Sequence, residues 1–226
     1  MQIGLIGGIG PAAQDYYTRQ LIALFSAADT ALEMTTVHAD APTLLSNLAA
    51  DRHAEQAAIF AALAERLQRA GAGCVAVTSI AGHFCREAFT PLSPLPVIDM
   101  IGAVTAAVSA RGFGRIGILG TRTVMESRLY GGITSAEVIA PPPPELDEVH
   151  LAYAAMATAG AITAAQQTTF NKAARRLIEV DGCEAILLGG TDLALAFDAE
   201  SSAVPLIDCA AIHTAAIARY ALVATR

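Results

Sequence analysis

The sequence predicts an α/β protein with two pseudo-symmetric lobes, each a parallel sheet flanked by helices. Three observations point to this class. Short apolar runs alternate with longer Ala-rich segments of helical period. The short runs are continuously apolar, which is typical of strands buried on both faces. Several of these runs then recur, in the same order, in the second half of the chain.

The predicted strands are short apolar runs near glycine or proline, and helical segments fill the intervals between them. In chain order the strands are Ile3–Ile6, Cys74–Val77, Val97–Ile98, Ile116–Leu119, Ala185–Leu188 and Leu206–Ile207. The run Pro141–Pro144 is interpreted as a rigid surface loop within the second lobe.

The repeat indicates an internal duplication. Residues 3–8 resemble 116–121, residues 71–79 resemble 182–190, and residues 96–99 resemble 205–208, at nearly constant spacing. We therefore expect a first lobe of residues 1–95 plus 210–226 and a second lobe of residues 96–209. Because ligands of open α/β sheets bind beyond the carboxyl ends of the strands, we expect loops from both lobes to face one cleft.

Composition excludes several classes of protein. The 226 residues carry a net charge of −7 and a single lysine, Lys172, so neither nucleic acid nor an anionic membrane is an expected partner. Although 54% of the residues are hydrophobic, no apolar stretch reaches the roughly 18 residues of a membrane span. The N-terminus lacks the pattern of a signal peptide. We expect a cytoplasmic protein.

Neither a metal nor a disulfide is expected. The four cysteines (Cys74, Cys85, Cys183 and Cys209) form no Cys-x-x-Cys pair. His38 and Asp40 have the spacing of metal ligands, yet two candidate ligands alone make a weak site. We predict no metal.

The segment Gly8–Ala13 follows a predicted strand and fits a loose G-x-G-x-x-A pattern. In a dinucleotide site an acidic residue follows about 20 residues later, whereas here Asp40 comes about 30 residues later. We therefore favour a simpler function, in which backbone N–H groups around Gly8 and Gly10 bind a carboxylate.

Four ordered motifs make the chain similar to the aspartate/glutamate racemase family. They are Ile3–Pro11 with Tyr16 and Tyr17, Gly120–Ser127 with Tyr130, Leu188–Asp192, and Pro205–Asp208 with Ile212 and His213. The resemblance spans essentially the whole chain. It implies a cofactor-independent homodimer that acts on an amino acid. In that family a thiolate removes the α-proton, and a thiol from the other lobe returns a proton to the opposite face.

The sequence departs from the family pattern at both thiol positions. Where the family has Cys-Asn-Thr-x-His, this chain has Ser79 four residues before His83. Where the family has Gly-Cys-Thr-Glu, this chain has Gly190 followed by Thr191 and Asp192. Symmetric racemisation by two thiols is therefore not expected. Cys85 is a possible substitute thiol, although a packing role is favoured for it.

Ser79, His83 and Asp192 are the candidate catalytic residues. A His83–Asp192 acid/base pair is favoured over a Ser/His/Asp hydrolase, because no G-x-S-x-G turn surrounds Ser79. Further groups could bind a carboxylate or stabilise an enediolate. These predicted substrate-binding residues are Gly8, Gly10, Thr78, Thr121, Thr123, Gly190 and Thr191. The alternative role for each threonine is to cap a helix.

The leading hypothesis is isomerase-type proton transfer at the carbon next to a carboxylate, on an amino acid or small carboxylic acid, without a cofactor. Two alternatives stay open. One is a catalytically inactive relative that binds a small carboxylate. The other is a decarboxylase or cis–trans isomerase of the same fold.

Overall fold

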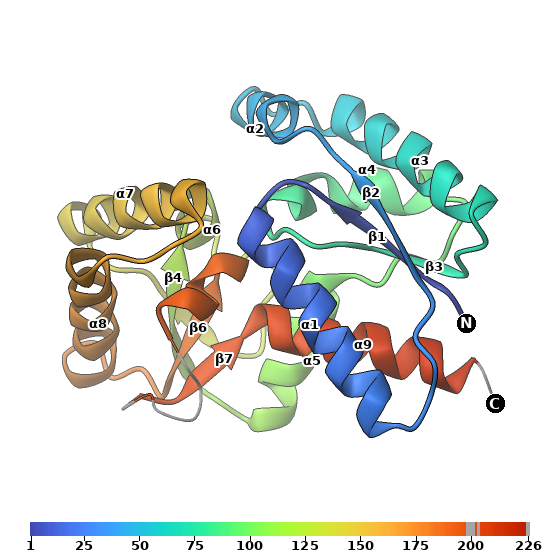
Figure 1. The fold of residues 1–226 in the computed structure, drawn as a ribbon. Coiled ribbons are helices and arrows are strands. Elements are labelled where there is room, and N and C mark those ends of the chain that lie inside the picture. The colour runs from blue at the N-terminus through green and yellow to red at the C-terminus, as the bar shows by residue number, and fades with distance from the viewer. Residues whose placement is uncertain (198–201, 203, 225–226) are drawn as a thin grey trace. The chain divides into compact units, whose positions relative to one another are not determined.

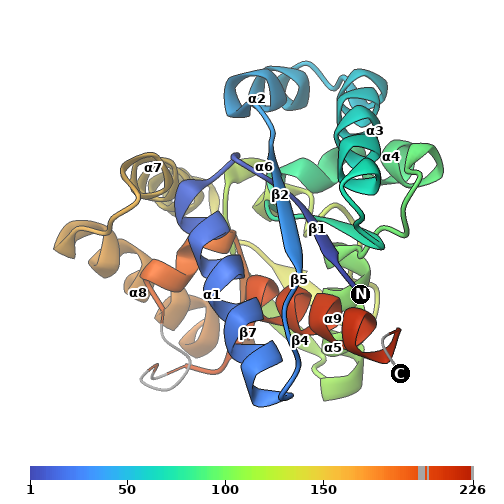
Figure 2. The ribbon, with the colours of Figure 1, turned by 45° about the vertical axis from the view of Figure 1, so that its right-hand side comes forward.

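The chain folds into two compact units (Figures 1 and 2). The computed structural model describes residues 1–197, 202 and 204–224. The first unit contains residues 1–100 and 210–226, and the second contains residues 101–209. Residues 96–100, which the sequence-based boundary gives to the second lobe, fall in the first unit because Val97 pairs with Val75 in a parallel bridge.

The first unit contains a parallel three-stranded sheet in the order β2-β1-β3. Its strands are β1 (Ile3–Gly7), β2 (Met34–His38) and β3 (Cys74–Val77). The longer helices between them are α1 (Pro11–Ala27), α2 (Ala41–Ala49) and α3 (His53–Arg69). Crossovers between parallel strands are right-handed, and β2 and β3 lie on opposite sides of β1, so α1 and α3 cover opposite faces of the sheet. Figure 2 shows α1 and α3 on either side of these strands.

Three short helical segments and a terminal helix complete this unit. A 3₁₀ helix η1 (Ala81–Cys85) follows β3 and continues into α4 (Arg86–Phe89) and η2 (Thr90–Leu92). The last helix is α9 (Cys209–Val223).

The second unit contains a parallel four-stranded sheet in the order β5-β4-β6-β7. Its strands are β4 (Arg115–Gly120), β5 (Glu137–Ile139), β6 (Ala185–Gly189) and β7 (Leu206–Asp208). Its helices are α5 (Met100–Arg111), α6 (Arg122–Glu126), α7 (Pro143–Ala159), α8 (Ala164–Glu179) and the 3₁₀ helix η3 (Thr191–Leu195). The predicted α/β class with two parallel sheets flanked by helices is confirmed.

The two sheets repeat the same pairing. In the first unit Ile3 lies opposite Cys74, and in the second Ile116 lies opposite Ala185. The bridge between Val75 and Val97 likewise corresponds to the pairing of Ile186 with Leu206. These are the segments that resemble one another in the sequence, so the internal repeat extends to the hydrogen-bond register.

The structure differs from the sequence prediction at four places. Strand β2 was missed because its exposure varies along the strand, and β5 was missed because it has only three residues. Residues 97–98 form an isolated bridge in place of a strand. The proline run is not simply a loop, since Pro143 and Pro144 form the first turn of α7, where a missing N–H group costs nothing.

The chain passes from one unit to the other at equivalent places. It leaves the first unit between Met100 and Ile101, at the start of α5, and returns between Cys209 and Ala210, at the start of α9. In both cases the crossing follows the outer segment of a sheet directly. No helix in the described ranges is long and apolar enough to cross a bilayer.

A left-handed turn follows α6. Arg128, Leu129 and Tyr130 have φ angles of 52°, 59° and 55°, and Gly131 follows with 66°. The turn is held by the Tyr130 N–H, which donates to the Ser127 hydroxyl at 3.0 Å, and by the Gly131 N–H, which donates to the Ser127 carbonyl at 2.8 Å. Because each non-glycine residue in this conformation costs roughly 1–2 kcal/mol, the segment stores strain.

We expect Arg128→Gly to raise the free energy of unfolding by about 0.5–1 kcal/mol, because the relief of strain exceeds the added freedom of the unfolded chain. Arg128 is exposed, so little packing is lost. Denaturant unfolding of the variant measures the change. The matched control is Arg175→Gly, in exposed helical backbone of α8, which should lower stability by about 1 kcal/mol. Destabilisation of the same size in both variants would contradict this prediction.

Candidate functional site

The loop after β3 brings Thr78, Ser79 and His83 together. Thr78 extends the pairing of β1 with β3, since its N–H donates to the Ile6 carbonyl at 3.0 Å. Its hydroxyl lies 3.4 Å from the same carbonyl, so Thr78 holds the loop against the sheet. Ser79 is buried, and no hydrogen bond to its hydroxyl occurs among the residues that the structure describes. The Ser79 hydroxyl is therefore the group of this loop that a ligand could bind.

His83 is buried in η1 with both ring nitrogens engaged. Its Nδ1–H donates to the Ser79 carbonyl at 2.8 Å, since a carbonyl can only accept. That assignment leaves Nε2 unprotonated, and Nε2 accepts a long bond of 3.4 Å from the Met100 N–H. Burial lowers the pKa of His83, against the opposing effect of Asp99, so the imidazole is neutral.

A second buried histidine of the first unit contacts His83 edge-on. His213, on α9, has its ring centroid 5.8 Å from that of His83. Its Nε2–H donates to the Ile98 carbonyl at 2.7 Å, and its Nδ1 accepts from the Tyr17 hydroxyl at 2.7 Å. Burial, with a smaller contribution from His83, lowers the pKa of His213 to about 3. His213 thus ties α9 to α1 as a neutral ring.

The loop between β1 and α1 contains the predicted binding residues Gly8 and Gly10. Gly8 has a φ of 92°, and a Cβ atom there would lie 2.8 Å from the Ala39 carbonyl oxygen, so the position requires glycine. Gly10 is the N-cap of α1. A cavity of about 380 Å³ opens beside this loop, lined by Gly8, Pro11, Gln14, Asp15, Thr18 and His38. Asp40 caps α2, because its carboxylate accepts from the Thr43 N–H at 2.9 Å.

In the second unit, the loop after β6 brings Gly190, Thr191 and Asp192 together with Tyr153 of α7. The Tyr153 hydroxyl donates to Asp192 Oδ2 at 3.0 Å, and both side chains are buried. A Cβ atom on Gly190 would lie 2.6 Å from Cζ and 2.7 Å from the hydroxyl oxygen of Tyr153. The phenol therefore fills the space into which a side chain at position 190 would extend.

The remaining predicted threonines lie on the other loop of the second sheet. Thr121 is the N-cap of α6, and its hydroxyl accepts from the Val124 N–H at 3.4 Å. This is the capping role named as the alternative for these residues. Thr123 is exposed on α6.

The surroundings of all four cysteines disfavour a thiolate. All are buried and free of disulfides. Burial raises the pKa of Cys85 to about 12 and that of Cys183 to about 11, and it raises the pKa values of Cys74 and Cys209 as well. The Cys85 thiol donates to the Gly82 carbonyl at 3.5 Å, as expected for a packing residue.

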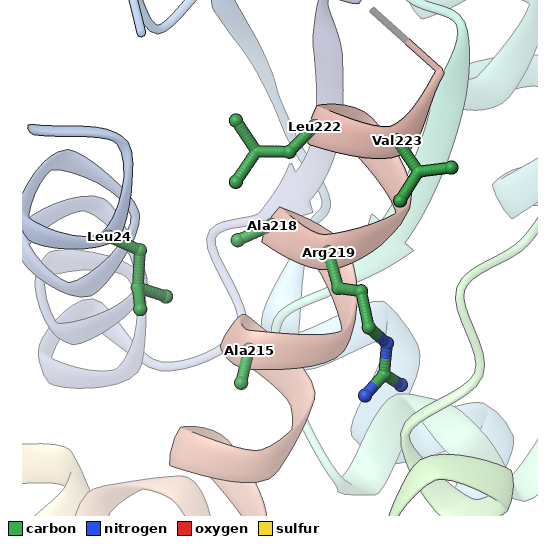
Figure 3. A pocket seen from close by; sticks show the side chains of 6 residues that line it. All are labelled: Leu24, Ala215, Ala218, Arg219, Leu222 and Val223. Carbon is green, nitrogen blue, oxygen red and sulfur yellow. The ribbon is translucent and has the colours of Figure 1, made fainter. Parts of the chain in front are cut away.

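A second hollow of about 380 Å³ lies between α1 and α9. Figure 3 shows Leu24 of α1 facing a row of α9 side chains, with Arg219 beside them. The lining is mainly apolar and includes no predicted site residue, so the polar loops after β3 and β6 are the better candidates for chemistry.

Sequence reasoning did not find Tyr153. Its spacing from Leu146, Val149 and Met156 places it on the buried face of α7. That pattern predicts burial only, and no sequence motif marks the loop that the phenol contacts. Of the predicted catalytic residues, Ser79 and His83 belong to the first unit and Asp192 to the second.

Each of the two parallel α/β units thus has polar loops at equivalent strand ends. The sequence profile of the Asp/Glu/hydantoin racemase family matches residues 6–217. The chain belongs to this family.

Solved structures share the fold. A candidate Asp/Glu racemase from Yersinia pestis is 26% identical, with a TM-score of 0.83 over 98% of this chain and 99% of that one. An aspartate racemase homologue from Pyrococcus horikoshii is 23% identical, with a TM-score of 0.81 over 98% and 99%. A glutamate racemase from Francisella tularensis, in complex with D-glutamate, is 16% identical, with a TM-score of 0.69 over 99% and 81%.

The buried His213 predicts acid-sensitive stability. Its folded pKa of about 3 lies below the ordinary value of 6.5, so the unfolded chain takes up a proton that the folded chain does not. The free energy of unfolding should fall by up to about 1.4 kcal/mol per pH unit as the pH drops below 6.5. Besides Tyr17, the titratable groups that act on this ring are His83, which opposes its protonation, and Asp99, which favours it.

Denaturant unfolding between pH 6.5 and pH 5.5 measures this slope. His213→Gln keeps a donor and an acceptor but does not titrate, so its slope should be flatter than that of the wild type. Identical slopes in the wild type and His213→Gln would refute the assignment.

The contact between Gly190 and Tyr153 predicts that Gly190→Ala is destabilising. The added methyl group forces the phenol to move, and overpacking of this kind costs typically about 1–3 kcal/mol. The control is Gly114→Ala, where the new Cβ meets only a flexible Glu184 carboxyl oxygen at 3.3 Å. Thermal or denaturant unfolding compares the two, and equal stability would show that the phenol does not restrict position 190.

Proposed function

We propose that this chain catalyses proton transfer at the carbon next to a carboxylate, on an amino acid or small carboxylic acid, without a two-thiol mechanism and without a cofactor. We also propose that it acts in the cytoplasm, as its sequence pattern predicts, and that it forms a homodimer, as the family resemblance implies. Ser79 and Gly190 are taken to stand at the family's two cysteine positions.

One observation carries the proposal. The loops after β3 and β6 follow strands with the same register in the two sheets, and each loop holds a buried group that can exchange a proton. In the first unit that group is His83, beside Ser79. In the second it is Asp192. Racemisation requires one proton-transferring group for each face of the reacting carbon, and this arrangement offers one from each repeat.

The protonation state of His83 suits a base. The ring is neutral, and its unprotonated Nε2 accepts only the long 3.4 Å bond from Met100. A substrate could replace that bond at small cost, since a hydrogen bond of this length is weak. The Ser79 hydroxyl lies in the same loop and could bind the substrate carboxylate.

The cysteines support a mechanism without thiolates. A thiol acts as a base only when deprotonated, and burial raises the pKa of Cys85 to about 12. The proposed substrate class is supported by a glutamate racemase of this fold that was solved with D-glutamate. Hydroxyl groups such as that of Thr191 are suited to the carboxylate that such ligands share.

A binding protein without activity is the second candidate. The observation that favours it is the engagement of both His83 nitrogens with backbone groups, which gives the ring a structural role. Such a protein would hold a carboxylate but leave its α-proton untouched.

Exchange of the α-proton in D₂O tests the proposal. We expect the protein to replace the α-proton of at least one acid in a panel of aspartate, glutamate and other 2-substituted acids, followed by NMR. His83→Ala and Asp192→Asn should each lower the exchange rate by about 100-fold or more, as expected for loss of an acid/base group.

Three variants serve as controls. His53→Ala and Asp29→Asn remove exposed side chains of the same types, and Cys85→Ser removes a buried thiol; all three should retain the exchange rate. Loss of exchange in Cys85→Ser would overturn the thiol-free mechanism. Thermal stabilisation by a carboxylate without any exchange would favour the binding protein instead.

A further inference from the structure

The phenol of Tyr153 occupies the place that a side chain on residue 190 would take. The three heavy atoms nearest to a Cβ atom built on Gly190 all belong to Tyr153, and its hydroxyl oxygen lies 2.7 Å away. The space beside the Gly190 backbone is therefore filled, although glycine has no side chain. Another residue, reaching in from the middle of α7, brings a proton-bearing group to the same point.

The hydroxyl is held in a specific orientation. It donates to Asp192 Oδ2 at 3.0 Å, and both side chains are buried. A phenylalanine would fill the same volume without requiring this partner. Because a buried hydroxyl without a partner is costly, and this one donates to a buried carboxylate, Asp192 fixes the position of the Tyr153 hydroxyl in the loop.

We propose that Tyr153, together with Asp192, is the proton-transferring group of the second lobe, in the place where the family's second thiol would stand. The inference rests on the proposed function and names a residue that acts in it. Asp192 is then the residue that receives the proton from Tyr153, and the phenol oxygen is the atom that meets the substrate.

The proton balance is that of a relay. The α-carbon–hydrogen bond breaks, and its proton goes to the phenol oxygen while the phenol's own proton passes to Asp192 Oδ2. The electron pair remains on the substrate and is delocalised into its carboxylate as an enediolate. The reverse step moves the proton from Asp192 to the phenol oxygen and the phenol proton to carbon, so no other reactant is needed.

The resting charge state is consistent with a relay. Burial, reinforced by the Asp192 carboxylate, raises the pKa of Tyr153 well above its ordinary value, so the phenol keeps its proton at neutral pH. A free phenolate is therefore not the base. Direct transfer to Asp192 avoids it, because the phenol hydroxyl already donates to Asp192 Oδ2 at 3.0 Å.

Tyr153→Phe tests the inference because it keeps the ring beside Gly190 and removes only the hydroxyl. Exchange of the α-proton is measured in D₂O separately for the L and the D enantiomer of a substrate that the wild type turns over. We expect kcat for exchange of one enantiomer to fall by about 100-fold or more, while its KM and the exchange of the other enantiomer change by less than about threefold. A purely structural role would affect both enantiomers alike.

Tyr220→Phe, on the exposed face of α9, is the matched control and should behave like the wild type. Equal losses for both enantiomers, or unchanged rates in Tyr153→Phe, would overturn the role of Tyr153 alone. A wild-type protein that exchanges no acid of the panel would overturn the proposed function, and this inference with it.

Discussion

In each repeat, the parallel pairing of the first and third strands determines where the loop with the predicted catalytic residues lies. Strands β1 and β3, and likewise β4 and β6, are buried along almost their whole length, so their backbone groups must bond to each other. A shift of one residue would turn every side chain to the opposite face. Burial thus fixes the register, and the register places the loops after β3 and β6 at the carboxyl edge of their sheets. The chemistry of the molecule depends on that edge.

The two repeats have the same strand pairing but different functional groups in their loops. After β3 the loop folds back on itself through His83, whose ring binds the loop's own backbone. After β6 the loop has no side chain at Gly190, and a neighbouring helix supplies one through Tyr153. Oxygen and nitrogen groups of this kind are weaker bases or weaker acids than a tuned thiol. Their usefulness depends on burial and on partners such as Asp192, which orient them and share the proton.

Most of the fold could be predicted from the sequence, but only some of the residues in each candidate loop. Strands such as β1 and β6 are apolar throughout because both faces of the sheet are covered. Such continuous apolar runs can be predicted as strands from a single sequence. Strand β2 is partly exposed, so its sequence lacks a continuous apolar run and did not predict a strand. Residues close in sequence, such as Ser79 and His83, were correctly placed in one loop. Tyr153 and Asp192 come from distant elements, and only the packing of α7 against that loop brings them together.

The place where the chain crosses between the units has a consequence for its synthesis. Domains generally fold in the order in which they emerge from the ribosome. Here the second unit is one continuous segment, whereas the first also needs residues from Ala210 onward. His213, which joins α9 to Tyr17, belongs to that late segment. The first unit is therefore the first to be synthesised and the last to be completed. The surroundings of the loop with Ser79 and His83 are complete only when α9 has been added.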